Sequence, residues 1–313
     1  MSSESNHSAL VTSWGSSPTY TSTPTPPPPG ANETQIRLLA AGVHRVVRSR
    51  ASGQHYSASI LPHTVGTDGT GLTVPDNKPV YFSAMGPAGG SMAEVLNVPT
   101  TSVVPLPEGA DAVQVAAMAN PAMSSWMALK TRTDGLPKDF SVVVLGVTSA
   151  SGRLGVSVAK TFGAGRVVGV ARNEGAMKAI GGLDEGVVLK EKAEETDWAK
   201  VGEVDVVLDY LYGAPAKACL EGLPKGKRVQ YVQIGSLAGE EMPLPSAVLR
   251  GKNITMRGAG PGAWSFQELG KEMGRIVGAA AGIEKQKLRV EKLKDVDTVW
   301  QEKSGSERLV FVP

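Results

Sequence analysis

The segment SVVVLGVTSASGRLGVSVAKTFGAGRVVGVAR, residues 141–172, constrains the fold of this chain more than any other stretch. Residues 142–145 form a continuous apolar run, which is typical of a parallel strand covered on both faces. A loop of small residues, 146–152, follows this run. The apolar residues after the loop recur at helical spacing, at Leu154, Val158 and Phe162. A second apolar run, RVVGVA, completes a strand–turn–helix–strand unit that is typical of dinucleotide-binding proteins.

The glycine pattern of the loop is imperfect. The fingerprint GxGxxG would place glycines at 147, 149 and 152, and these positions hold Val147, Ser149 and Gly152. On the loop alone, an α/β turn without a ligand remains an alternative. The start of the following helix nevertheless offers unpaired amides and a positive dipole end to a pyrophosphate. We predict that phosphate contacts come from Thr148, Ser149, Ala150, Ser151, Gly152, Arg153 and Leu154.

Arg172 stands at the end of the second strand, where a protein that binds NAD usually carries an acidic residue. A carboxylate there would bind the ribose 2′-hydroxyl, whereas a guanidinium suits a 2′-phosphate. The residue therefore favours NADPH as the cofactor. Asn173 and Lys178 are candidate supporting contacts, although a lysine on an exposed helix is usually only solvated.

Composition excludes several classes of protein. The chain has 313 residues, enough for two domains with a full core each, and its net charge is only +2, without a basic stripe. We therefore expect no nucleic-acid partner. A single cysteine, Cys219, excludes an intramolecular disulfide and suits a reducing compartment. No stretch has the apolar length needed to cross a bilayer, and the first residues do not resemble a signal peptide. We expect a soluble, cytoplasmic protein that does not bind membranes.

Two domains are predicted along the chain. Residues 1–9 are expected to form a flexible tail, and residues 10–120 with 266–313 a catalytic domain built as an irregular β-barrel. Residues 121–265 would form the cofactor domain. The proline-rich segment 21–33 is read as an extended edge leading into a strand at 34–43, although a linker or a polyproline ligand is an alternative.

Several motifs, in order, resemble the medium-chain dehydrogenase/reductase superfamily, and within it the zinc-independent quinone oxidoreductases related to zeta-crystallin. The matching segments are AAGVHRVV (40–47), LPHTVGTDGTG (61–71), VAAMANPAMSSWMAL (115–129), VLGVTSASGRLGVSVAK (144–160) and the closing RLVFVP. The resemblance implies an α/β fold with a GroES-like barrel and a doubly wound Rossmann domain. It also implies hydride transfer from NADPH to a quinone or an α,β-unsaturated carbonyl.

The resemblance also implies which metal ligands are missing. Zinc alcohol dehydrogenases place a cysteine and a histidine where this chain has His44 and Thr67. A threonine does not replace an imidazole as a zinc ligand. We therefore expect no catalytic metal.

Further site residues follow from the resemblance, for Ser124, and from positions at the ends of expected strands, for Tyr210 and two loops. Ser124 would contact the nicotinamide or bond its own helix backbone. Tyr210 would contact a ribose or the substrate, or belong to the core. Two loops at strand ends would cover the cofactor or be plain turns, namely Ile234, Gly235 and Ser236, and Gly258, Ala259 and Gly260.

On the substrate side, Tyr56 and His44 are the candidate proton donors, and Trp264 is a candidate apolar wall for a flat acceptor. Each of these three has a purely structural alternative. The resemblance further implies a homodimer through the edge segment 253–260.

Two other functions remain open on the sequence. One is a reductase dedicated to a single secondary metabolite. The other is an NADPH-binding scaffold protein that performs no chemistry, since a scaffold would also retain Arg172 and the loop of small residues.

Overall fold

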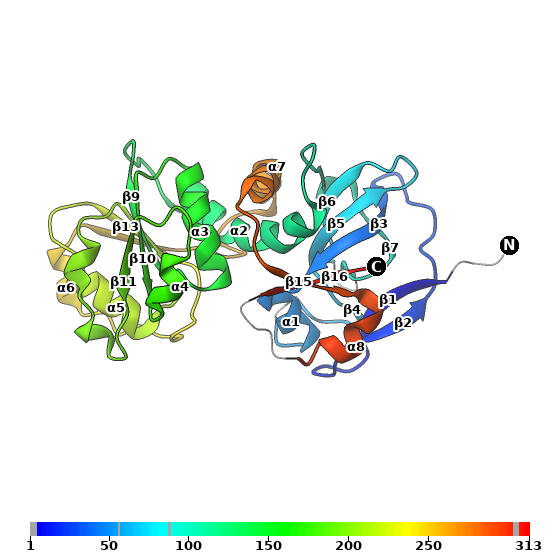
Figure 1. Ribbon diagram of the computed structural model, residues 1–313, viewed down its shortest axis with the longest axis horizontal. Helices are drawn as coiled ribbons and strands as arrows, with labels where there is room; N and C mark the ends of the chain where they lie inside the picture. The colour runs from blue at the N-terminus through cyan, green and yellow to red at the C-terminus, as the bar shows by residue number, and fades with distance from the viewer. Residues whose placement is uncertain (1–4, 56, 87–88, 303–306) are drawn as a thin grey trace. The chain divides into compact units, whose positions relative to one another are not determined.

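A computed structural model of the chain describes residues 5–55, 57–86, 89–302 and 307–313 (Figure 1). The chain divides into two compact units. The first consists of Met1–Asn120 and Gly270–Pro313, and the second of Pro121–Leu269. Among the described helices, none is long and apolar enough to cross a membrane.

The second unit is built on a six-stranded parallel sheet, as the apolar runs of the sequence predict. In spatial order its strands are β11 (Glu185–Val188), β10 (Arg166–Ala171), β9 (Ser141–Leu145), β12 (Val206–Asp209), β13 (Val229–Gln233) and β14 (Ile254–Gly258). The strand order reverses between β9 and β12, the point at which doubly wound sheets bind nucleotides. This arrangement confirms the predicted Rossmann topology.

Helices cover both faces of this sheet (Figure 1). On one face lie α3 (Ala150–Thr161) and α4 (Glu174–Lys178), and on the other α5 (Gly213–Gly222) and α6 (Ser246–Gly251). The core beneath α5 joins valines of β9, β10 and β12 to alanines and Cys219 of the helix. Cys219 is fully buried there, so it serves as a small core residue.

The first unit is mainly antiparallel and contains two sheets. The larger is ordered β15 (Leu288–Lys292), β16 (Arg308–Val312), β3 (Glu33–Gly42), β5 (Asp68–Thr73), β6 (Pro79–Ser83) and β8 (Val103–Pro105), with β7 (Val95–Pro99) also paired to β3. The smaller is ordered β2 (Thr19–Thr23), β1 (Asn6–Val11) and β4 (His63–Thr64). Short strands, bulges and the helices α1 (Arg45–Ala51) and α8 (Val296–Val299) match the predicted barrel-like domain.

Two longer helices span the division between the units. They are α2 (Ala112–Arg132) and α7 (Phe266–Gly282). Pro121 lies inside α2 and has no backbone N–H, so one helical hydrogen bond is missing where the second unit begins.

The prediction of a flexible tail over residues 1–9 is wrong for its second half. Strand β1 begins at Asn6 and pairs with both β2 and β4. Ala9 and Val11 are fully buried in the core of the first unit. The proline-rich segment after β2 does lead into β3, and the carbonyl of Pro27 accepts a hydrogen bond from Asn97 Nδ2 at 2.9 Å.

Candidate active site

Most of the predicted cofactor residues lie at one edge of the parallel sheet. Because all six strands run in the same direction, the residues that follow them emerge at the same carboxyl edge. The phosphate loop follows β9, Arg172 follows β10 and Tyr210 follows β12. The other two predicted loops follow β13 and β14. Open α/β sheets bind ligands at this edge, so its arrangement suits a nucleotide.

The phosphate loop is held in a tight turn. Gly146 has φ +83°, a conformation that a residue with a Cβ rarely adopts, and its amide donates to Val170 O at 2.9 Å. A Cβ at Gly152 would collide with the carbonyl of Gly146. Glycine is therefore required at both positions, whereas the fingerprint positions 147 and 149 tolerate side chains. This explains why the imperfect pattern still forms the expected turn.

Ser149 is the N-cap of α3. Its Oγ accepts from Gly152 N at 3.0 Å, and its carbonyl accepts from Arg153 N at 3.0 Å. Ser149 N itself donates to Gly146 O at 2.9 Å. Among the described contacts, the amides of Ala150 and Ser151 have no acceptor, so they are the two that a phosphate can take.

The remaining loop residues play a more structural part. Leu154 is buried at 2% exposure within the helix, so its side chain packs on the sheet. Arg153 Nε donates to Thr148 O at 3.3 Å, which ties the start of the helix back to the loop.

The three residues proposed for the 2′-phosphate differ in their surroundings. Arg172 is exposed, and no described side chain pairs with it. Asn173 is the N-cap of α4, with Oδ1 accepting from Ala176 N at 2.9 Å. Lys178 lies 2.7 Å from Glu174 in an exposed ion pair one helical turn away. Arg172 is therefore the best placed of the three to bind an anion.

Ser124 and Tyr210 contact each other. Ser124 Oγ donates to Pro121 O at 2.7 Å and lies 3.2 Å from the hydroxyl oxygen of Tyr210. Tyr210 is 4% exposed, and burial raises the pKa of its phenol. A Cβ on Gly155 would lie 3.6 Å from that hydroxyl oxygen, so the ring packs against α3. The local backbone bond of Ser124 and the core position of Tyr210 match their structural alternatives.

The two strand-end loops pack on their neighbours. The amides of Ile234 and Gly235 both donate to Asp209 O, at 2.8 and 3.0 Å, and Ser236 Oγ donates to Glu240 Oε1 at 2.9 Å. Ala259 N donates to Gln233 O at 2.8 Å. Each loop is thereby held at the carboxyl edge of the sheet. Gly258 ends β14, Gly260 follows two residues later, and Trp264 is half-buried in the next turn.

On the side of the first unit, His44 precedes α1 and belongs to a buried polar cluster. We call His44, Thr67, Asp68, Tyr81, Asn120 and Arg308 the barrel cluster. Thr67 Oγ1 and Asn120 Nδ2 donate to Asp68 Oδ1 at 2.6 and 3.0 Å, and Tyr81 OH donates to Oδ2 at 3.0 Å. Three of the cluster's residues, Asp68, Tyr81 and Arg308, come from strands, and all six residues lie within the first unit.

The cluster fixes the tautomer of His44. Arg308 Nη1 lies 3.0 Å from His44 Nδ1, and a guanidinium can only donate, so Nδ1 is the acceptor. The ring proton of neutral His44 then sits on Nε2, which is 3.7 Å from Asp68 Oδ2. Burial lowers the pKa of Arg308 to about 10, against the opposing effect of Asp68, so Arg308 remains charged at neutral pH.

Tyr56, the first candidate proton donor, lies outside the described residues. Within the described ranges, no group of three or more His, Cys, Asp or Glu side chains could hold a metal ion.

Sequence reasoning missed most of the barrel cluster. In the sequence, Asp68 belongs to the glycine-rich segment 61–71 and Arg308 to the closing strand RLVFVP, and neither pattern assigns the residue a role in the site. Their charges were the available signal, because aspartate and arginine are rarely buried unless they are paired. The sequence, however, gives no sign that two residues 240 positions apart meet in the folded protein.

The comparisons with known proteins agree with this architecture. No family model matches the chain. The chain is 35% identical to a protein of Emericella nidulans described as the probable NADPH-dependent quinone reductase tdiC, over 98% of this chain and 100% of that relative.

Solved structures share the whole fold. That of AibC has a TM-score of 0.84 at 18% identity and covers 100% of this chain and 97% of AibC. A cobalt- and zinc-bound thermostable alcohol dehydrogenase from Pyrobaculum aerophilum has a TM-score of 0.76 at 20% identity, with 99% and 100% covered. The fold alone therefore does not decide whether a metal is used. The near-complete alignment with the Emericella protein does decide the family: the chain belongs to the quinone oxidoreductases of the medium-chain dehydrogenase/reductase superfamily.

Proposed function

We propose that this protein reduces a quinone or an α,β-unsaturated carbonyl with NADPH and without a metal. The observation that carries the proposal is the 35% identity, over nearly the whole chain, with a reductase described as NADPH-dependent and quinone-reducing. A dedicated secondary-metabolite reductase or a non-catalytic scaffold is not favoured by this relationship.

The carboxyl edge of the parallel sheet fits the cofactor. The amides of Ala150 and Ser151, with the positive end of the α3 dipole, would bind the pyrophosphate. Arg172 would bind the 2′-phosphate through charge-assisted hydrogen bonds. When bound, NADPH supplies a hydride from its nicotinamide to the electrophilic carbon of the acceptor.

The reduced acceptor then requires a proton. We propose the Tyr56 hydroxyl or water as its source, and Trp264 as an apolar wall beside the acceptor. His44 would act as a positioning residue, because Arg308 donates to its Nδ1 and its Nε2 is buried 3.7 Å from Asp68 Oδ2, without a hydrogen-bond partner among the described residues.

The barrel cluster supports a reaction without zinc. At the positions where the resemblance places two zinc ligands, His44 accepts from Arg308 and Thr67 donates to Asp68. A guanidinium in contact with the imidazole would also repel a second cation. We keep two further proposals, a cytoplasmic location and a homodimer through β14, which is an edge strand of its sheet.

A steady-state assay tests this function. Purified protein is offered NADPH or NADH with a panel of ortho-quinones, para-quinones and enones, and nicotinamide absorbance is followed. We expect turnover with NADPH that a chelator leaves intact. Tight NADPH binding without turnover on any acceptor would instead indicate a scaffold, and a large loss with chelator would refute the metal-free reaction.

Arg172→Ala tests the cofactor assignment. Loss of a charged partner for the 2′-phosphate should weaken NADPH binding roughly tenfold or more, with NADH affinity unchanged. Lys178→Ala is the matched control, because Lys178 is already paired with Glu174. Unchanged NADPH affinity in Arg172→Ala would remove Arg172 from the site.

A further inference from the structure

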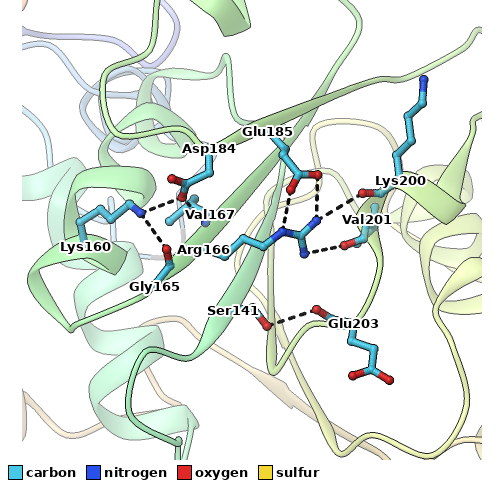
Figure 2. Close-up of polar contacts among 10 residues, drawn as sticks. All are labelled: Ser141, Lys160, Gly165, Arg166, Val167, Asp184, Glu185, Lys200, Val201 and Glu203. Carbon is cyan, nitrogen blue, oxygen red and sulfur yellow. Dashed lines mark hydrogen bonds and ion pairs between the residues drawn. The ribbon is translucent and has the colours of Figure 1, made fainter.

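The charges at the two ends of β10 and β11 are arranged differently. At the amino edge each cation has an acid (Figure 2). Arg166 binds Glu185 through two hydrogen bonds, Nε to Oε1 at 2.8 Å and Nη2 to Oε2 at 2.9 Å. Lys160 Nζ lies 2.7 Å from Asp184 Oδ2. These pairs neutralise the start of both strands.

At the carboxyl edge, a cation follows each of the same two strands, Arg172 directly after β10 and Lys190 two residues after β11. Leu189 N donates to Ala171 O at 2.9 Å, which extends the ladder beyond the pairing of Ala171 with Val188. In this register Arg172 lies opposite Leu189, and Lys190 is one residue further along, so both cations leave the sheet at the same edge. Both are exposed, and neither has a side-chain partner among the described residues.

Two lysines nearby in the sequence differ from Lys190, because each forms an ion pair with a glutamate. Lys178 is paired with Glu174 at 2.7 Å, and Lys192 with Glu195 at 3.5 Å. The backbone at Lys190 is also anchored, because its N–H donates to Thr196 Oγ1 at 3.0 Å. The backbone of Lys190 is thus held in place, while its ammonium group has no side-chain partner among the described residues.

We propose that Lys190 and Arg172 together bind the 2′-phosphate of NADPH, so that Lys190 is a second determinant of cofactor choice. Like charges at the ends of adjacent strands repel each other, and a bound anion removes this repulsion. A phosphate monoester carries close to two negative charges at neutral pH and matches two cations. The ribose hydroxyl of NADH offers no such charge. This inference rests on the proposed use of NADPH.

The test is a calorimetric titration of the full chain with NADPH, NADH and adenosine 2′,5′-bisphosphate. Lys190→Ala should weaken NADPH and the bisphosphate roughly tenfold and leave NADH within twofold. Lys190→Arg should retain most of the affinity. Lys192→Ala is the control, since it removes a paired lysine two residues away and should change neither affinity.

The outcomes separate the inference from the proposed function. If the native chain prefers NADPH and Lys190→Ala keeps that preference, the role of Lys190 is overturned and the function stands. Equal losses for NADPH and NADH also overturn it, because they indicate a general effect on the site. If the native chain does not prefer NADPH over NADH, both proposals fail together.

Discussion

His63 is an unusual residue within the first unit. It is fully buried, and neither ring nitrogen has a hydrogen-bond partner within the part of the chain that the structure describes. Burial first, and then the positive charge of Arg50, lower its pKa below the ordinary value. The folded protein therefore holds His63 neutral, and the unfolded chain binds a proton there more readily.

This difference predicts a pH dependence of stability. As pH falls below about 6.5, the ordinary histidine value, the unfolded chain is protonated at His63 before the folded protein is. The free energy of unfolding should then decrease until pH reaches the lowered folded pKa, by at most about 1.4 kcal/mol per pH unit for one proton.

Replacing His63 by leucine should remove this part of the acid slope and avoid burying two unpaired nitrogens. Urea unfolding at pH 7.5 and 5.5 measures the change in the free energy of unfolding between the two pH values. The variant His7→Gln is a control that retains His63. Parallel pH slopes in the native chain and His63→Leu would contradict the prediction.

At the level of elements, β1 connects the chain's first residues to the barrel core. It lies between β2 and β4, and Val11 pairs with His63 of β4. Val11 is fully buried and belongs to the main core of the first unit. The strand is therefore part of the fold and not an extension of it.

Val11→Ala tests the role of β1. Removing two buried methyl groups should lower the free energy of unfolding by roughly 2 kcal/mol, from lost burial and the cavity left behind. Val74→Ala, at an exposed position, should change it little. A negligible effect of Val11→Ala on urea unfolding would mean that β1 does not contribute to the folded state.

The elements that sequence reasoning predicted well carry their signal locally. The unit β9–α3–β10 has buried apolar runs and a glycine turn within about thirty residues, so its fold and its phosphate loop could be predicted. Strand β1 was missed because NHSALV mixes polar and apolar residues and becomes a strand only through distant partners. The barrel cluster was missed for the same reason, since it assembles from residues that the chain brings together only on folding.

Among the described residues, one hydrophobic cluster lies wholly in the first unit and another wholly in the second. A ligand that binds only the folded state stabilises it by an amount set by its concentration relative to its Kd. The proposed cofactor contacts of Ala150, Ser151 and Arg172 all lie in the unit Pro121–Leu269. Stabilisation by cofactor should therefore be concentrated in that unit.

Hydrogen exchange with mass detection measures how much the cofactor stabilises each unit. NADPH at a hundred times its Kd should raise the opening free energy of β9, β10 and β12 by up to about 2.7 kcal/mol. NADH at the same concentration should protect these strands less. Equal protection of β3 and β5 in the first unit would contradict a cofactor held mainly by the parallel sheet.

The position of β16 has a consequence for how the protein is made. This strand lies between β15 and β3 in the larger sheet of the first unit, yet it consists of Arg308–Val312. During translation, residues 121–269 leave the ribosome before β16 exists, whereas the end of β3, at Ala41 and Gly42, must wait for its partners on β16. The nascent chain can therefore complete the second unit while the larger sheet of the first unit still lacks β15 and β16 and keeps one edge of β3 exposed to aggregation.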